Sequence, residues 1–131
     1  MREIKFRAWH KEHKRFYKVI ALYQMLSGKV KQVQLEGLNN LIPIGAIKLL
    51  QYTGLKDKNG KEIYEGDVVR YLDYDYKVED EYYNTGHVDY DDEVGCYYFT
   101  NRYSVEMDEI IYDEVEIIGN IHEKKEWNNV K

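Results

Sequence analysis

Residues 52–69, YTGLKDKNGKEIYEGDVV, constrain the fold more than any other part of the chain, because two turn signals and the start of a strand fall within them. Asn59-Gly60 favours a tight turn with positive φ, which glycine and a few short polar residues adopt at little cost. Gly66 lies in a second turn that leads into apolar Val68-Val69. We expect Asp67 to cap this turn by accepting hydrogen bonds from nearby backbone amides. The segment predicts where two turns and a strand lie, and it contains no motif that indicates a catalytic or binding site.

Short extended runs separated by turns continue on both sides of this segment. In Ile4-Lys5-Phe6-Arg7-Ala8-Trp9, apolar and charged residues alternate with the period of a half-buried strand. Residues 10–14 are the expected turn, 37–40 read as a loop, and the acidic, Tyr-bearing residues 75–83 are too polar for a core and predict a long hairpin loop. Further extended segments are expected at residues 15–23, 30–35, 46–52, 67–74, 86–90, 95–100 and 115–121. A short helical turn is the alternative for residues 46–52.

The class that follows is all-β. No apolar stripe with a period of 3.6 residues is sustained, and there is no room for repeated crossover helices. Residues 105–112 fit either a helical turn or a loop, and residues 122–127 fit a short terminal helix. We therefore predict short antiparallel strands in a barrel-like or sandwich architecture, with little helix.

Charge divides the chain into two opposite halves. Residues 1–61 contain 13 Lys/Arg and 4 Asp/Glu, a net charge of +9, whereas residues 62–131 contain 6 and 20, a net charge of −14. The sign changes between Lys61 and Glu62. We predict a basic N-terminal β region over residues 1–51, a connector with turn motifs over 52–66, and an acidic, Tyr-rich, small barrel-like module over 67–131.

Composition narrows the cellular setting. The single cysteine, Cys96, cannot form an intrachain disulfide, and no charged and then apolar leader precedes Ile4. The longest apolar run, residues 42–50, is interrupted by Pro43, Gly45 and Lys48 and is far shorter than the roughly 20 residues of a membrane helix. We expect a cytoplasmic protein without a membrane span.

No motif indicates catalysis, a cofactor or a metal. Lys56, Lys58 and Lys61 beside two glycines suggest a phosphate loop, but a strand follows them where a helix N-terminus is needed. Cys96 lies in an apolar strand, where a thiol usually packs as a small hydrophobe. Turn chemistry and packing therefore explain both features, and we expect a protein that is not an enzyme and has no cofactor.

The acidic residues and the histidines could form a calcium or a zinc site, or they could simply be solvent-exposed. A calcium loop starting at Asp73 would place Lys77 and Asn84 at positions that need a ligand and a bidentate glutamate. The histidines lack a cysteine pair or an HExxH motif that would complete a zinc site. We interpret the acidic groups as a solvated face and the histidines as surface residues; they are Asp73, Asp75, Glu79, Asp80, Glu81, Asp89, Asp91, Asp92, Glu93, His10, His13, His87 and His122.

The basic half carries the strongest functional signal, because cations alternate there with aromatic residues. That combination suits single-stranded nucleic acid, through stacking and phosphate contact. The alternative is that the aromatics are core and the charges are their solvent-facing neighbours. The residues of the possible nucleic-acid surface are Arg7, Trp9, Lys11, Lys14, Arg15 and Tyr17.

Three segments together resemble the YopX family of phage and prophage proteins. They are MREIKFRAW at the start, QYTGLKDKNGKEIYEGDVV in the centre and VEIIGNI near the end, in the family's order and covering essentially the whole chain. His122 departs from the pattern, since an aromatic is commoner there. The resemblance implies a mostly β protein encoded by a bacterial virus or prophage, within the host cytoplasm, and it supplies no biochemical activity.

The oppositely charged halves can satisfy each other across a domain contact or head to tail between subunits, and we favour such self-association over nucleic-acid binding. The sequence thus predicts a homo-oligomeric, non-enzymatic interaction protein that binds a host or phage protein. Two alternatives stay open. One is a nucleic-acid-binding or regulatory accessory protein that uses the basic aromatic surface. The other is a decoy in which the acidic residues 73–93 imitate nucleic acid.

Overall fold

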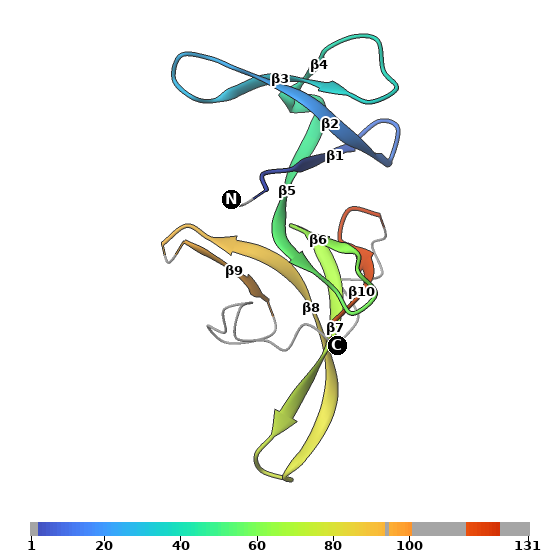
Figure 1. The fold of residues 1–131 in the computed structure, drawn as a ribbon, viewed down its shortest axis with the longest axis vertical. Helices are drawn as coiled ribbons and strands as arrows, with labels where there is room; N and C mark the ends of the chain where they lie inside the picture. Colours follow the sequence, from blue (N-terminus) through green and yellow to red (C-terminus); the bar gives the residue numbers. More distant parts are fainter. Residues whose placement is uncertain (1–2, 94, 101–114, 124–131) are drawn as a thin grey trace. The chain divides into compact units, whose positions relative to one another are not determined.

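The chain folds into antiparallel strands (Figure 1). The structure, a computed structural model, describes residues 3–93, 95–100 and 115–123. Its strands form one sheet of order β4-β3-β2-β1-β5-β6 and a second of order β10-β7-β8-β9. Within the described ranges the helical content is a single 3-10 turn, η1 (Ile44–Ala46), and no helix is long and apolar enough to cross a membrane. The predicted all-β class is confirmed, in two open sheets rather than a closed barrel.

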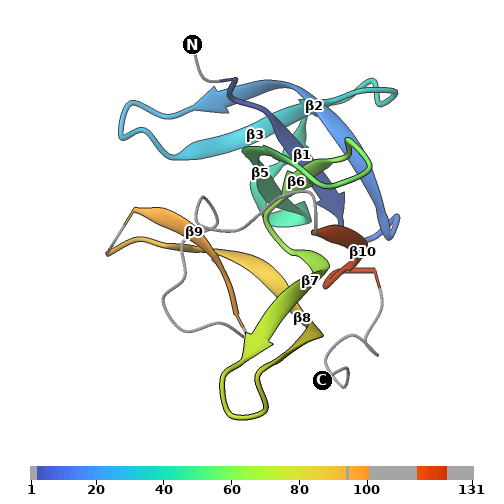
Figure 2. The ribbon, with the colours of Figure 1, turned by 60° about the horizontal axis from the view of Figure 1, so that its bottom comes forward.

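The first of two compact units comprises residues 1–52. Here β1 (Phe6–His10) pairs with β2 (Arg15–Gln24) on one side and with β5 (Ile47–Lys56) on the other. Strand β2 continues the sheet to β3 (Val30–Leu35), which lies beside it (Figure 2). Strand β3 also pairs with the short β4 (Ile42–Pro43). The core of this unit is small and aliphatic; its fully buried members are Ala8, Val33, Leu35 and Ile47.

The second unit comprises residues 53–131 and has its own core. After the end of β5 come β6 (Glu62–Tyr64), β7 (Asp67–Asp75), β8 (Asp80–Asp91), β9 (Cys96–Phe99) and β10 (Glu116–Asn120). The β7 strand lies between β8 and β10, and β8 lies between β7 and β9. The core is richer in aromatics than that of the first unit and consists of Ile63, Val69, Tyr71, Val88, Tyr97, Phe99 and Val115.

The prediction of a long hairpin loop at residues 75–83 is wrong. Strands β7 and β8 stay paired through Tyr74 and Glu81 to Asp75 and Asp80, so only residues 76–79 form the turn. The low hydrophobicity of this stretch excludes it from a core but does not prevent pairing, because tyrosine favours extended backbone even where both faces meet solvent. Asp75, Asp80 and Glu81 therefore stand on strands, and Glu79 lies in the turn between them.

The turn predictions are confirmed where they can be followed. Residues 11–14 connect β1 to β2, and Gly60 and Gly66 adopt φ values of 81° and 83°. The strands predicted at residues 86–90, 95–100 and 115–121 correspond to parts of β8, β9 and β10. The predictions for residues 105–112 and 124–127 lie outside the described residues, and residues 121–123 form a turn.

Candidate interaction surfaces

Asp57 fixes the turn in the central segment to the last strand. Its Oδ1 accepts hydrogen bonds from the backbone N–H groups of Asn59 and Lys61, both at 2.9 Å, and its Oδ2 accepts one from Ile117 N–H at 3.0 Å. Burial raises the pKa of the carboxyl, but these three bonds and the charge of Lys61 outweigh it, and the net pKa is lowered. The Asn59 and Lys61 amides that a phosphate would need are bonded to Asp57, which supports the turn interpretation.

Asp67 caps the second turn, as predicted. Its Oδ2 accepts from the Tyr64 N–H at 2.8 Å, and its Oδ1 accepts from the Asn120 side-chain amide at 3.1 Å. The Ile121 N–H donates to the carbonyl of Gly66 at 2.9 Å, which ties the same turn to the end of β10. Asp57 and Asp67 thus connect residues 57–67 to β10 at two places, and the segment is a structural clasp.

An ion-pair chain covers the outside of this clasp. Lys58 Nζ lies 2.8 Å from Glu116 Oε2, and Arg70 lies 3.5 Å from Glu116 Oε1. The hydrogen bond from Lys58, followed by its charge, lowers the pKa of Glu116. The other two lysines of the predicted loop, Lys56 and Lys61, are exposed to solvent. Solvent-exposed ion pairs of this kind contribute little to the stability of the fold.

The six residues of the predicted nucleic-acid surface do not share one face. Side chains of neighbouring residues in a strand point to opposite faces, and Ala8 pairs with Tyr17 while Trp9 pairs with Phe16. One face therefore carries Arg7 and Trp9; the Arg7 guanidinium lies 4.2 Å from the Phe16 ring centroid, and Trp9 meets the same ring edge-on at 4.9 Å.

The opposite face of the same strands carries a second group. The Arg15 guanidinium lies 4.8 Å from the ring centroid of Tyr17, and Tyr17 packs on the side of Ala8 and the small core. The remaining two residues of the prediction lie in the exposed turn between β1 and β2: Lys14, and Lys11, whose Nζ donates to the Gly45 carbonyl at 3.0 Å. Cations do lie beside aromatic rings, but the alternation of side chains along each strand places them on two opposite faces of the sheet.

Two histidines stack beside this second group. The rings of His10 and His13 are parallel within 7° with centroids 3.7 Å apart, and His13 Nδ1 lies 2.7 Å from the Tyr17 hydroxyl. The His13 N–H donates to His10 Nδ1 at 3.1 Å, so this nitrogen carries no proton. Burial, followed by the charge of His13, lowers the pKa of His10. His10 is buried, which differs from the predicted surface position.

The described residues contain no group of three or more His, Cys, Asp or Glu that could hold a metal ion. His87 contacts Thr100, with 3.3 Å between Nδ1 and Oγ1, and burial lowers its pKa. His122 is half-buried in the turn that follows β10. Cys96, the single cysteine of the sequence, is half-buried at the start of β9. Among the described residues, these positions do not form a catalytic constellation.

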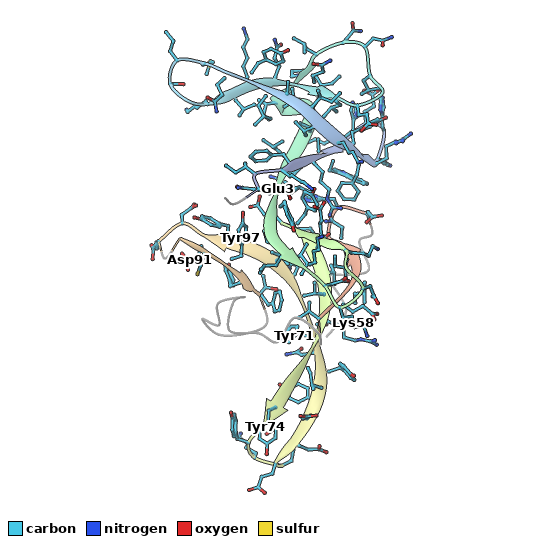
Figure 3. All side chains as sticks on the ribbon, in the orientation of Figure 1. Glu3, Lys58, Tyr71, Tyr74, Asp91 and Tyr97 are labelled. Atoms are coloured by element: carbon cyan, nitrogen blue, oxygen red, sulfur yellow. The ribbon has the colours of Figure 1, made fainter. Side chains whose placement is uncertain are left out.

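The free end of the β7–β8 hairpin extends past β9 and β10 (Figure 1) and carries four acidic residues and five large exposed side chains. Four other acidic residues of the predicted face, Asp89, Asp91, Asp92 and Glu93, lie at the opposite end of β8 and in the turn that follows it. We name residues 74–83 the tyrosine arm. Figure 3 shows Tyr74 near the tip, beyond the core residue Tyr71. From the sequence, Tyr74 is expected at the end of a strand, whereas Tyr76, Tyr82 and Tyr83 are expected in an acidic loop. The exposed side chains are Tyr74, Tyr76, Val78, Tyr82 and Tyr83.

The family model of the YopX protein matches residues 5–127. The chain belongs to the YopX family. The three segments that suggested the family lie on β1, on the clasp with its flanking strands, and on β10, so the family's signature coincides with the elements that hold the fold.

A solved structure shares the fold of this YopX-family chain. The crystal structure of protein EF1440 from Enterococcus faecalis superposes with a TM-score of 0.67 at 24% sequence identity, over 97% of this chain and 99% of that chain. At this identity the likeness concerns the fold alone. No curated protein matches the sequence.

Proposed function

We propose that this YopX-family protein, encoded by a phage or prophage and acting in the cytoplasm of the bacterial host, is a non-enzymatic interaction protein that self-associates and binds a protein partner. The observation that carries the proposal is the distribution of charge between the two compact units. Residues 1–52 contain 10 Lys/Arg and 3 Asp/Glu, a net charge of +7, and residues 53–131 contain 9 and 21, a net charge of −12. Each unit therefore presents a field that attracts the other unit of a second copy.

Hydrophobic exposure supports the same proposal. Both units carry large apolar side chains more than 40% exposed, including Leu26 at 110% in the basic unit and Tyr76 at 85% in the acidic one. Exposed aromatic and aliphatic groups ringed by charge are typical of protein-binding surfaces. The central segment holds the fold through Asp57 and Asp67, which leaves these surfaces as the better candidates for function.

The nucleic-acid alternative is weaker on two grounds. A single strand stacks on aromatics that share a face with the cations, whereas here the predicted residues lie on two faces and a turn. The whole chain is also acidic, with a net charge of −5. Electrophoretic shifts with random single-stranded and duplex probes at low salt would favour this alternative if they disappear on charge reversal at Lys11, Lys14 and Arg15.

Sedimentation velocity over a series of salt concentrations tests the proposed self-association. We expect a mass above that of one chain at about 20 mM salt and a decline toward one chain at about 0.5 M, since exposed charge pairs are screened at high ionic strength. A mass equal to one chain at both concentrations contradicts the proposal.

A further inference from the structure

We infer that the tyrosine arm of one copy docks on the basic hairpin of a second copy; this inference rests on the proposed self-association. The basic hairpin is residues 15–35, which comprise β2, its turn and β3. It contains four Lys/Arg and no Asp/Glu, whereas the tyrosine arm contains four Asp/Glu and one lysine. The two hairpins are therefore opposite in charge.

The arm is built to present aromatic side chains on a paired scaffold. Tyr83 lies beside Leu72 across the β7–β8 ladder, and Tyr74 lies beside Glu81 two positions further toward the tip. The Arg70 guanidinium lies 5.0 Å from the Tyr83 ring centroid, and Tyr74 meets Tyr76 edge-on at 4.7 Å. These contacts orient the rings before any partner arrives.

The tip of the arm is fixed by its own turn. The Asp75 carboxylate accepts a hydrogen bond from the Lys77 N–H at 2.8 Å, and Glu79 adopts a φ of 54° to close the turn. A two-stranded ribbon alone is marginally stable in water, yet this one is continuous with the sheet at Tyr71. A preorganised arm loses little conformational freedom on binding, which raises its affinity.

Tyrosine is the residue that such an arm needs for a protein partner. It supplies a large rigid surface with a polar tip, and it is enriched among the residues that dominate binding energy. Exposed fractions of 85% for Tyr76 and 66% for Tyr83 leave most of these two side chains available. The surrounding carboxylates of the arm specify a basic partner surface rather than a neutral one.

The basic hairpin offers the matching features. Its exposed cations include Lys18, Lys29 and Lys31, and its turn residue Leu26 is fully exposed. Further apolar surface comes from side chains on the same hairpin that are between 43% and 59% exposed; they are Ile20, Tyr23 and Met25. Apolar contact areas framed by lysines complement tyrosines framed by carboxylates.

The proposed contact joins two different surfaces, an arm and a hairpin. Two copies can exchange arms across a two-fold axis, which gives a closed dimer, whereas a one-way contact generates a ring or an open chain with one unused arm at one end and one unused hairpin at the other. Each of these assemblies contains the same docked pair of hairpins, and sedimentation at low salt distinguishes them.

Removal of the aromatic anchors tests the arm. The double substitution Tyr76→Ser with Tyr83→Ser should raise the dissociation constant of self-association at least about tenfold at low salt. Ile4→Ser is the matched control, because Ile4 is 71% exposed and lies on neither hairpin. It should leave the dissociation constant unchanged. Equal dissociation constants for the double variant and the wild type overturn the inference.

Charge exchange tests the pairing itself. One variant carries Glu79→Lys and Glu81→Lys in the arm, and the other carries Lys29→Glu and Lys31→Glu in the hairpin. Each alone should fail to associate, and an equimolar mixture should associate again, because each variant then supplies what the other lacks. The control for the arm, Asp92→Lys with Glu93→Lys, makes the same change in net charge in the exposed turn after β8 and should still associate.

The outcomes separate this inference from the proposal on which it rests. If the wild type does not associate at low salt, both fail. If the wild type associates but the arm variants match it, or if the mixture of reversed variants stays monomeric, the docking surfaces are wrong and the proposed self-association stands. Circular dichroism of each variant verifies that its strand content is retained, and recovery in the mixture is a result that misfolding cannot produce.

Discussion

The substitution Asp57→Asn removes one carboxylate oxygen from a buried position where both oxygens are used. The Asn59 and Lys61 amides share Oδ1, and the Ile117 amide from β10 uses Oδ2. An asparagine oxygen can keep the two bonds within the turn. Its amide group then faces the Ile117 N–H, so two donors oppose each other and the tie to β10 is lost.

The expected cost follows from that geometry. A hydrogen bond to a charged group contributes about 1.5–3 kcal/mol, and a buried donor without a partner costs about 1–3 kcal/mol. Because the side chain of Asp57 is 5% exposed, water cannot replace the missing acceptor easily. We expect Asp57→Asn to lower the free energy of unfolding of the second unit by about 2–4 kcal/mol. The neighbouring Lys58→Ala, which removes an exposed ion pair with Glu116, should change the unfolding midpoint little.

Urea unfolding followed by far-ultraviolet circular dichroism gives the midpoints, and hydrogen exchange of peptides that contain Ile117 assigns the loss to β10. The pKa of Asp57 is lowered in the fold, so its contribution is present above the unfolded value of about 3.9 and is lost as the pH falls through the folded pKa. The difference between wild type and Asp57→Asn should therefore shrink below about pH 4. A midpoint for Asp57→Asn equal to that of Lys58→Ala would refute the reasoning.

Three further predictions concern single positions. Acidification from about pH 7 to about pH 5 should lower the urea midpoint of the first unit, because the pKa of His10 is lowered in the fold and the unfolded chain takes up the proton near 6.5. His10→Asn should reduce this pH dependence of the midpoint. A wild-type midpoint that does not change with pH argues against the role of His10. Gly60→Ala should cost about 1 kcal/mol by thermal unfolding because φ is 81°, whereas Gly45→Ala, which also has open space for a Cβ, should cost less; equal losses would contradict the backbone argument. Asn120→Asp places a second carboxylate against Asp67, so its thermal midpoint should fall most at neutral pH and recover toward about pH 4, and a pH-independent loss would count against direct repulsion.

Local chemistry made part of this structure predictable. The positive φ of Gly60 and Gly66 and the cap from Asp67 follow from which residues tolerate such turns and bond their own backbone. The same reasoning could not find the bond between Asp57 and Ile117, because these residues are 60 positions apart and only the folded sheet brings them together. The turns of the clasp could be predicted from the sequence, and the hydrogen bond that connects the clasp to β10 could not.

The candidate surfaces divide in the same way. Composition identified cations beside aromatics in the first unit. The face of the sheet on which each of them lies depends on the pairing of Ala8 with Tyr17 across a turn. The alternation of residues within a single strand does not specify that pairing. Polarity led to a loop at residues 75–83, although Tyr82 and Tyr83 stand on a paired strand. The alternation of tyrosine and acid there was the available signal, since tyrosine is enriched in strands.

Zero-length carbodiimide cross-linking at low salt tests the central claim most directly. Equal amounts of unlabelled and ¹⁵N-labelled protein are mixed, and mass spectrometry of the digested products identifies links between copies. The docking of the tyrosine arm on the basic hairpin predicts mixed-isotope links from Glu79 or Glu81 to Lys29 or Lys31, and their loss at about 0.5 M salt. Links confined to single copies, or mixed links that avoid both hairpins, would contradict it.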